Sequence, residues 1–180
     1  VGFYLFHDAE AALWTVLEGS PGVVVSAGTG SVAQALTTDG RLLSAGGFGY
    51  RAGDEGGGYW IAVEALRAVF RSLDGRDPEP GFAAALVSTT GLEAPYRLVD
   101  WVQTEGRTPS EIASLASVMD RASADTEDAI ADRILREAGE WLAELACHLM
   151  KQSGVPPTVG LNGSILLKSP RVGRAFEQAV

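Results

Sequence analysis

The residues that could do chemistry gather first in the short segment "SAGTGS", residues 26–31. Glycines on both sides of Thr29 allow positive φ angles and let an anionic group approach the backbone closely. The hydroxyl groups of Thr29 and Ser31 add hydrogen-bond donors. This composition is typical of a phosphate-binding turn between two strands, although a purely structural Gly-Thr-Gly turn would look the same. The G-K-[ST] ending of a Walker loop and the spacing of a dinucleotide fingerprint are both absent from the segment.

A second glycine-rich segment, "GGFGYRAGDEGGGYW" at residues 46–60, places an aromatic ring and two carboxylates in front of a helix. A carboxylate such as that of Asp54 can accept hydrogen bonds from neighbouring hydroxyl groups, and the Phe48 ring offers an apolar face. These groups together suit a sugar. The alternative is that Asp54 and Glu55 cap the helix that begins near Gly57. Capping would explain the acidic residues, but not the glycines that precede them.

A third candidate is Asp8, which stands after His7 and before an apolar helical pattern. Its carboxylate could act as a general base. From spacing alone, however, the better interpretation is that Asp8 is the N-cap of the first helix. Glu10 would then add to the favourable interaction with the helix dipole.

The periodicity of apolar residues predicts the elements that must position these segments. Helices are expected over residues 9–17, 58–73 and 126–152 and from Ser164 onward, with several short helices within 82–119. The runs "GVVVSAG", "SVAQALTT" and "RLLSAGG" predict a meander of three strands, and a short strand is expected near 158–161. Ser110 is predicted to cap a helix ahead of Glu111, and Gly154 to end the long helix. No repeat or linker divides the sequence, which favours a single α/β unit.

Composition narrows the class of protein. The 180 residues are 46% hydrophobic, enough for one sizeable core, and carry a formal net charge of -9. Because only 14 Lys and Arg residues are spread along the chain, nucleic acid is not an expected partner. No apolar run reaches the ~18 residues of a membrane span. The expected location is therefore cytoplasmic, with no membrane partner. The single cysteine, Cys147, cannot form an internal disulfide and is expected to be a small buried residue.

Taken in chain order, several of these segments closely resemble the BadF/BadG/BcrA/BcrD ATPase family, which includes the N-acetylglucosamine kinases. The resemblance rests on Asp8-Ala9, "SAGTGS", "GGFGYRAGDEGGGYWIAVEAL", and a long helix before a strand and "NGS". It implies an α/β, actin-like ATPase (ribonuclease H-like) fold, in which a mixed sheet with a three-stranded meander is flanked by helices. It also implies that residues 1–180 are the C-terminal lobe of a two-lobed sugar kinase or ATPase. That lobe is expected to be incomplete at both ends, with the N-terminal lobe and the final strand absent.

The resemblance further implies an activity and a role for each candidate residue. The expected function is ATP-dependent phosphorylation of an amino sugar, foremost N-acetylglucosamine, with ATP and Mg²⁺ as cofactors. Asp8 looks like the carboxylate that takes the proton from the attacking sugar hydroxyl. Phosphate contacts are implied for Gly28, Thr29, Gly30 and Ser31, sugar contacts for Gly47, Phe48, Gly49 and Asp54, and adenosine contacts for Ala124, Gly163 and Ser164. No metal ligand is assigned within these residues.

The sequence also departs from the family pattern, which leaves alternatives open. The first phosphate site and the Mg²⁺ ligands of the family belong to a strand-turn-strand that this sequence lacks. Phe48 replaces the usual tryptophan, and Asn162-Gly163 stands where paired glycines are common.

One alternative is an ATPase activator of a 2-hydroxyacyl-CoA dehydratase or benzoyl-CoA reductase system, which is disfavoured because Cys147 alone cannot hold an iron-sulfur cluster. The other is an inactive nucleotide-binding fragment. The sequence does not separate N-acetylglucosamine, glucosamine, N-acetylmuramic acid and glucose as substrates, and the middle helices could support a homodimer.

Overall fold

The computed structural model describes residues 8–126, 128–155 and 158–180, without the side chains of residues 8, 9 and 123–126. Its elements follow in the order α1 (Asp8–Leu17), β1 (Gly22–Ala27), β2 (Ser31–Leu36), β3 (Leu42–Gly46), α2 (Gly58–Leu73), α3 (Ala83–Thr90), α4 (Arg97–Gln103), α5 (Pro109–Ala113), α6 (Ala116–Thr126), α7 (Ala129–Ser153), β4 (Val159–Asn162), α8 (Ser164–Lys168) and α9 (Pro170–Ala179). The helices and strands predicted from periodicity are therefore present, with ends that shift by a few residues.

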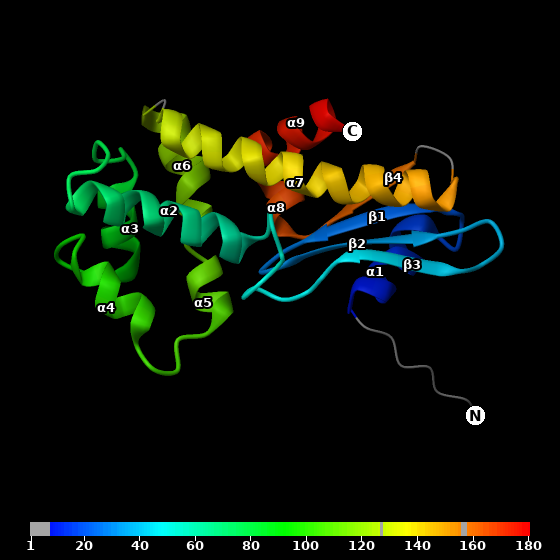
Figure 1. The fold of residues 1–180 in the computed structure, drawn as a ribbon, viewed down its shortest axis with the longest axis horizontal. Helices are drawn as coiled ribbons and strands as arrows, with labels where there is room; N and C mark the ends of the chain where they lie inside the picture. The colour runs from blue at the N-terminus through cyan, green and yellow to red at the C-terminus, as the bar shows by residue number, and fades with distance from the viewer. Residues whose placement is uncertain (1–7, 127, 156–157) are drawn as a thin grey trace.

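The described strands form one mixed sheet in the order β3-β2-β1-β4. Strands β1, β2 and β3 pair antiparallel in succession, which confirms the predicted meander. Strand β4 comes from far along the chain and pairs parallel with β1, so that Asn162 lies beside Ser26. The carboxyl ends of β1 and β4 and the start of β2 therefore meet at one end of the sheet, on the side toward α2 and α5 (Figure 1).

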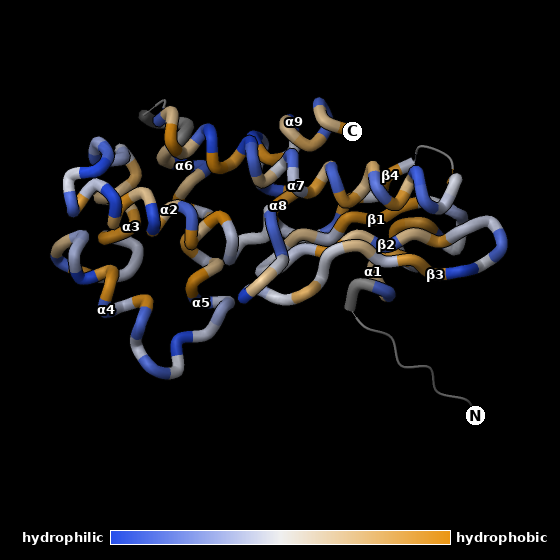
Figure 2. The backbone as a smooth tube through the Cα atoms, in the orientation of Figure 1, coloured by the Kyte–Doolittle hydropathy of each residue, from blue (hydrophilic) through white to orange (hydrophobic). Residues whose placement is uncertain are grey.

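Helices cover the two faces of the sheet, with α1 on one face and α7 on the other (Figure 1). Successive side chains of a strand point to opposite faces, so β1 serves both layers. Val24 packs with Leu13 and Leu17 of α1, whereas Val23 and Val25 belong to the larger core that includes α7. Figure 2 shows the apolar strands lying between these two helices.

Helix α7 is the longest element and has clear start and stop signals. The Asp128 side chain accepts hydrogen bonds from the backbone N–H groups of Ile130 and Ala131 at 2.8 and 3.1 Å, and Gly154 ends the helix in the left-handed conformation. The stop at Gly154 is as predicted. Cys147 is only half-buried on this helix, with its Sγ atom 3.8 Å from the carbonyl oxygen of Ala179, so the prediction of a buried residue is wrong.

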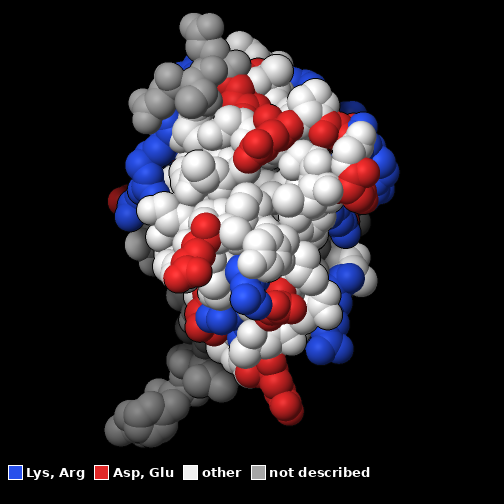
Figure 3. Space-filling view, turned by 90° about the vertical axis from the view of Figure 1, so that its left-hand side faces the viewer, with Lys and Arg blue, Asp and Glu red and all other residues white. Residues whose placement is uncertain are grey.

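Helices α2 to α6 extend beyond the end of the sheet at which β1 and β4 finish, and they pack there as a helical layer (Figure 1). The prediction that Ser110 caps α5 is wrong, because Thr108 is the N-cap and forms a reciprocal capping box with Glu111. Proline at the first helical position, residue 109, explains the shift. The end of the molecule formed by these helices carries acidic and basic side chains interspersed (Figure 3). In the part of the chain that the structure describes, no helix has the length and apolar character needed to cross a membrane.

Candidate functional site

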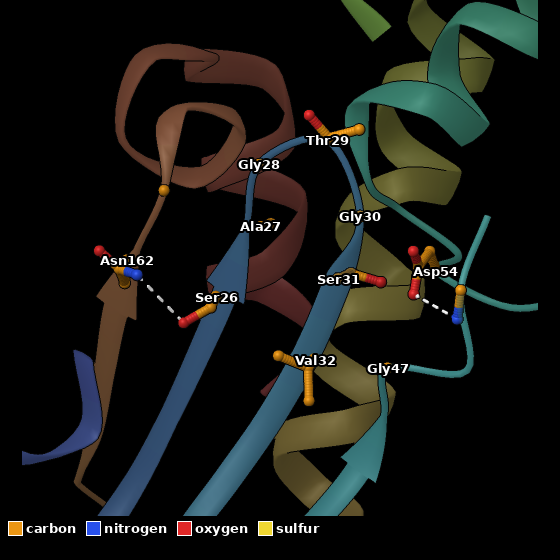
Figure 4. Close-up of a pocket in the computed structure, with 12 residues that line it drawn as sticks. Ser26, Ala27, Gly28, Thr29, Gly30, Ser31, Val32, Gly47, Asp54 and Asn162 are labelled. Carbon is orange, nitrogen blue, oxygen red and sulfur yellow. Dashed lines mark hydrogen bonds between the residues drawn. The ribbon is translucent and has the colours of Figure 1, made fainter. Parts of the chain in front are cut away.

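A cavity of about 390 Å³ lies at the end of the sheet where β1, β2 and β4 meet (Figure 4). It brings together three of the residue sets predicted from the sequence. Its lining includes Gly28–Ser31 from the predicted phosphate hairpin, Gly47, Gly49 and Asp54 from the predicted sugar loop, and Gly163 from the predicted adenosine motif. Segments separated by more than a hundred positions thus share one surface.

The hairpin between β1 and β2 is held from behind by the first turn of α2. The N–H groups of Gly58 and Tyr59 donate to the carbonyl oxygens of Gly28 and Thr29 at 2.8 and 2.9 Å. These bonds satisfy two of the amide groups that a helix leaves unpaired at its N-terminus. Within the described residues, the N–H groups of Thr29 and Gly30 have no protein acceptor. They are therefore available to an anionic ligand, as in other glycine-rich anion sites.

Ser31 differs from its neighbours because its side chain is already engaged. It is only 4% exposed, and its hydroxyl donates to the carbonyl oxygen of Glu55 at 2.7 Å. The hydroxyl hydrogen therefore joins the hairpin to the loop that carries the two acidic residues. The contact with phosphate implied for Ser31 stays a prediction, and this bond would have to change for the hydroxyl to donate to a phosphate.

Asp54 reaches from the glycine-rich loop toward the hairpin. Its Oδ1 atom accepts a hydrogen bond from the Gly49 N–H at 3.2 Å, and its backbone adopts a φ of 60°, an uncommon value for a residue with a side chain. The proposed capping role is wrong, since the N-cap of α2 is Gly57, without a side-chain cap, and no acidic residue lies in the first turn. Asp54 is thus a carboxylate at the cavity, close to both glycine-rich segments (Figure 4).

Phe48 does not line this cavity in the structure. Its side chain is 82% exposed, although Gly47 and Gly49 on either side of it do line the cavity. The ring could meet a sugar only after a change in the side chain or the loop. Its assignment to sugar binding stays a prediction.

Gly163 connects β4 to α8 and allows their close approach to β1. Its φ is 90°, and a Cβ atom added to it would lie 2.2 Å from the carbonyl oxygen of Ala27. Beside it, the Asn162 side-chain amide donates to the Ser26 hydroxyl at 3.1 Å. Sequence analysis missed Ser26 and Asn162 as lining residues, because only the parallel pairing of β1 with β4 brings them together.

A second cavity of about 350 Å³ lies between α6 and α8. Ser164, Asp120 and Arg121 are among its lining residues. The Ser169 hydroxyl donates to Asp120 at 2.7 Å, and burial raises the pKa of the Asp120 carboxyl, although this hydrogen bond opposes the shift. Predicted residue Ala124 belongs to the same helix, but its side chain lies outside the described residues, as does that of Asp8 at the start of α1.

The described residues contain no group of three or more His, Cys, Asp or Glu side chains that could hold a metal ion. Of the described residues that line the first cavity, Asp54 is the one with a carboxylate. The residues described here therefore do not fit a complete Mg²⁺ site, and no step of the reaction is derived through one.

The sheet order and the glycine-rich hairpin at its end define a class of protein, the actin-like ATPase fold, which the solved structure reported below shares. The chain belongs to the BadF/BadG/BcrA/BcrD ATPase family, whose model matches residues 2–180. The resemblance found in the sequence and the expected fold are both confirmed.

Three known proteins are similar to the chain. The chain is 35% identical to the N-acetylmuramic acid/N-acetylglucosamine kinase of Clostridium acetobutylicum over 136 residues. This match covers 76% of the chain and 44% of the kinase. The chain is 26% identical over 156 residues to the N-acetyl-D-glucosamine kinase of Dictyostelium discoideum, covering 86% of this chain and 49% of that protein. The structure of a candidate N-acetylglucosamine kinase from Chromobacterium violaceum superposes with a TM-score of 0.78 at 31% identity, over 96% of this chain and 56% of that one. The chain thus spans about half the length of the relatives it matches.

Proposed function

We propose that the protein containing this chain is an ATP-dependent amino-sugar kinase, with N-acetylglucosamine as the foremost substrate. One observation carries the proposal: a single cavity unites the glycine-rich hairpin, the Asp54 carboxylate and Gly163. Phosphoryl transfer depends mainly on placing the phosphate donor and the acceptor hydroxyl in line and on neutralising charge. A turn that binds phosphate beside a carboxylate that binds sugar hydroxyls would meet the first requirement. The kinase names of the related proteins support the same assignment.

In this proposal the nucleotide lies across both cavities. Its phosphates meet the N–H groups of Thr29 and Gly30, and its nucleoside passes Gly163 and Ser164 into the cavity beside α6. This arrangement is supported by two adjacent residues, since Gly163 lines the first cavity and Ser164 the second. The absence of a Cβ atom at Gly163 leaves room at Ala27. The adenosine contact assigned to Ala124 would come from the same helix.

The sugar lies at the Gly47–Gly49 loop with Asp54 accepting hydrogen bonds from its hydroxyl groups. A hydroxyl oxygen of the sugar attacks the γ-phosphorus, Asp8 takes the proton of that hydroxyl, and ADP leaves with the electron pair of the broken P–O bond. Mg²⁺ carried by the nucleotide would neutralise phosphate charge. Asp8 is the first residue of α1, which packs against β1, one of the strands whose carboxyl ends form the cavity.

Release of ADP by the full-length protein tests the proposal. We expect Mg-ATP to give ADP at a rate that depends on the added sugar, compared among N-acetylglucosamine, glucosamine, N-acetylmuramic acid, glucose and no sugar. Asp8→Asn should lower this rate by a factor on the order of 10² or more. Asp100→Asn, at an exposed position of α4, is the matched control and should leave the rate unchanged. ATP hydrolysis that ignores every sugar and Asp8 would refute the kinase assignment and favour the activator.

We also infer that residues 1–180 form the C-terminal lobe of a two-lobed enzyme, because the chain matches about half of each relative. Residues from both lobes should be needed for turnover, so the isolated 180-residue chain should release no ADP above background. Measurable turnover by that chain would contradict this inference. The homodimer and the cytoplasmic location remain predictions, which light scattering and cell fractionation of the full-length protein would test.

A further inference from the structure

The two halves of the phosphate hairpin contact different parts of the molecule. Gly28 and Thr29 receive hydrogen bonds from the first turn of α2 through their carbonyl oxygens. Gly30 and Ser31 instead face the loop that carries Asp54 and Glu55 (Figure 4). The family resemblance assigns all four residues to phosphate, whereas their contacts divide them into two pairs.

The two glycines of the hairpin have different surroundings. A Cβ atom built on Gly30 would lie 2.1 Å from Asp54 Oδ2 and 2.6 Å from Asp54 Cγ. A Cβ atom built on Gly28 would meet no heavy atom within 4 Å. Glycine at position 30 therefore makes room for the Asp54 carboxylate, while the space beside Gly28 is open to a ligand.

Ser31 fixes the same carboxylate through the backbone. Its buried hydroxyl holds the carbonyl of Glu55, the residue after Asp54. The Asp54 carbonyl accepts a hydrogen bond from the Gly57 N–H at 3.0 Å, and the Asp54 carboxylate accepts one from Gly49. Asp54 has a positive φ, a conformation that persists only where surrounding contacts enforce it. Ser31 supplies one of these contacts, and Gly30 leaves the space that they require.

We propose that Gly30, through the space at its Cα atom, and Ser31, through its hydroxyl group, are positioning residues for Asp54, and through it for the sugar. Phosphate lies beside the open side of Gly28 and meets the N–H groups of Thr29 and Gly30. The inference rests on the proposed function, because it takes Asp54 as the sugar-binding carboxylate. It predicts that substitutions only two positions apart in one turn weaken the binding of different substrates.

Calorimetric titration of the full-length protein with N-acetylglucosamine and, separately, with Mg-ADP tests this division. Gly30→Ala should raise the Kd for the sugar about tenfold or more, the effect of losing a hydrogen bond to a charged group, and should change the Kd for Mg-ADP less than about twofold. Gly28→Ala, the matched variant, should do the reverse. Ser31→Ala should follow Gly30→Ala, with a smaller effect. Equal changes in both Kd values for Gly30→Ala, or a change confined to Mg-ADP for Ser31→Ala, would overturn the proposal.

A thermal double-mutant cycle tests the contact itself without any ligand. The three atoms nearest to the added methyl group of Gly30→Ala all belong to Asp54, so the variant should lower the Tm of the parent. The same substitution in an Asp54→Ala background should lower the Tm much less, because the clashing carboxylate is gone. Equal Tm losses in the two backgrounds would contradict the contact. If the parent protein binds Mg-ADP but none of the amino sugars, the proposed function fails, whereas the cycle and the Mg-ADP titrations still decide the roles of Gly28 and Gly30.

Discussion

Substitution of Gly163 by alanine should be among the most damaging single-methyl changes in this protein. The residue has a φ of 90° and a ψ of 159°, a region that essentially only glycine occupies. Its added Cβ atom would lie 2.2 Å from the carbonyl oxygen and 2.6 Å from the carbonyl carbon of Ala27. Ala27 is fully buried in β1, so its backbone cannot move aside without disturbing the centre of the sheet.

Two contributions set the expected loss of folding stability in Gly163→Ala. The backbone conformation alone should cost about 1–3 kcal/mol. Overpacking against a fixed neighbour should add about 1–3 kcal/mol, for a total of roughly 2–6 kcal/mol. In a domain of this size each kcal/mol lowers the Tm by about 2–4 °C, so the loss should be on the order of 4–24 °C.

Gly91 offers a matched control, because it ends α3 with a φ of 70° and a Cβ atom there would meet nothing within 4 Å. Gly91→Ala should therefore cost only the left-handed conformation, about 1–2 kcal/mol. Scanning calorimetry of the two variants gives the difference, and titration with Mg-ADP should show weaker binding only for Gly163→Ala. A Tm loss no larger for Gly163→Ala than for Gly91→Ala would refute the argument from the Ala27 contact.

Two further predictions concern α7 and the cavity beside α6. Gly139→Ala should destabilise the protein by about 1–2 kcal/mol, because overpacking against backbone atoms of α9 at 2.6 and 2.8 Å outweighs the gain in helix propensity. Gly173→Ala, whose nearest neighbour would be at 3.5 Å, should stabilise it by about 0.5–1 kcal/mol, and denaturant titrations showing the same sign for both would contradict this reading. Burial raises the pKa of the Asp120 carboxyl in the folded protein. The folded protein therefore loses stability as the pH rises above the ordinary aspartate range and this carboxyl becomes charged. Asp120→Asn should therefore raise the Tm at pH 7 by an amount that disappears in acid, and a gain independent of pH would argue against this cause.

Local sequence determined most of the framework. The run of three valines in β1, the alternation in β2 and the helical spacing of α2 and α7 each predicted an element that the structure contains. Such patterns depend on which face of a single element is buried, and burial leaves its period in the sequence. The cap of α5 could also have been predicted, since Thr108 precedes a proline and stands three residues before Glu111.

The site depended on information that no single segment carries. Whether Asp54 caps a helix or faces a cavity was open in the sequence, because both roles place an acidic residue before a helix. Packing decided it, by setting Gly30 against the carboxylate and Gly57 at the helix start. Likewise, Asn162 and Ser26 are 136 positions apart and meet only because β4 pairs parallel with β1. Sequence by itself thus determined the elements and the glycine-rich turns, since these follow from local periodicity and backbone freedom. Only the tertiary structure decided which turns share a cavity, because strand pairing between distant segments leaves no local pattern.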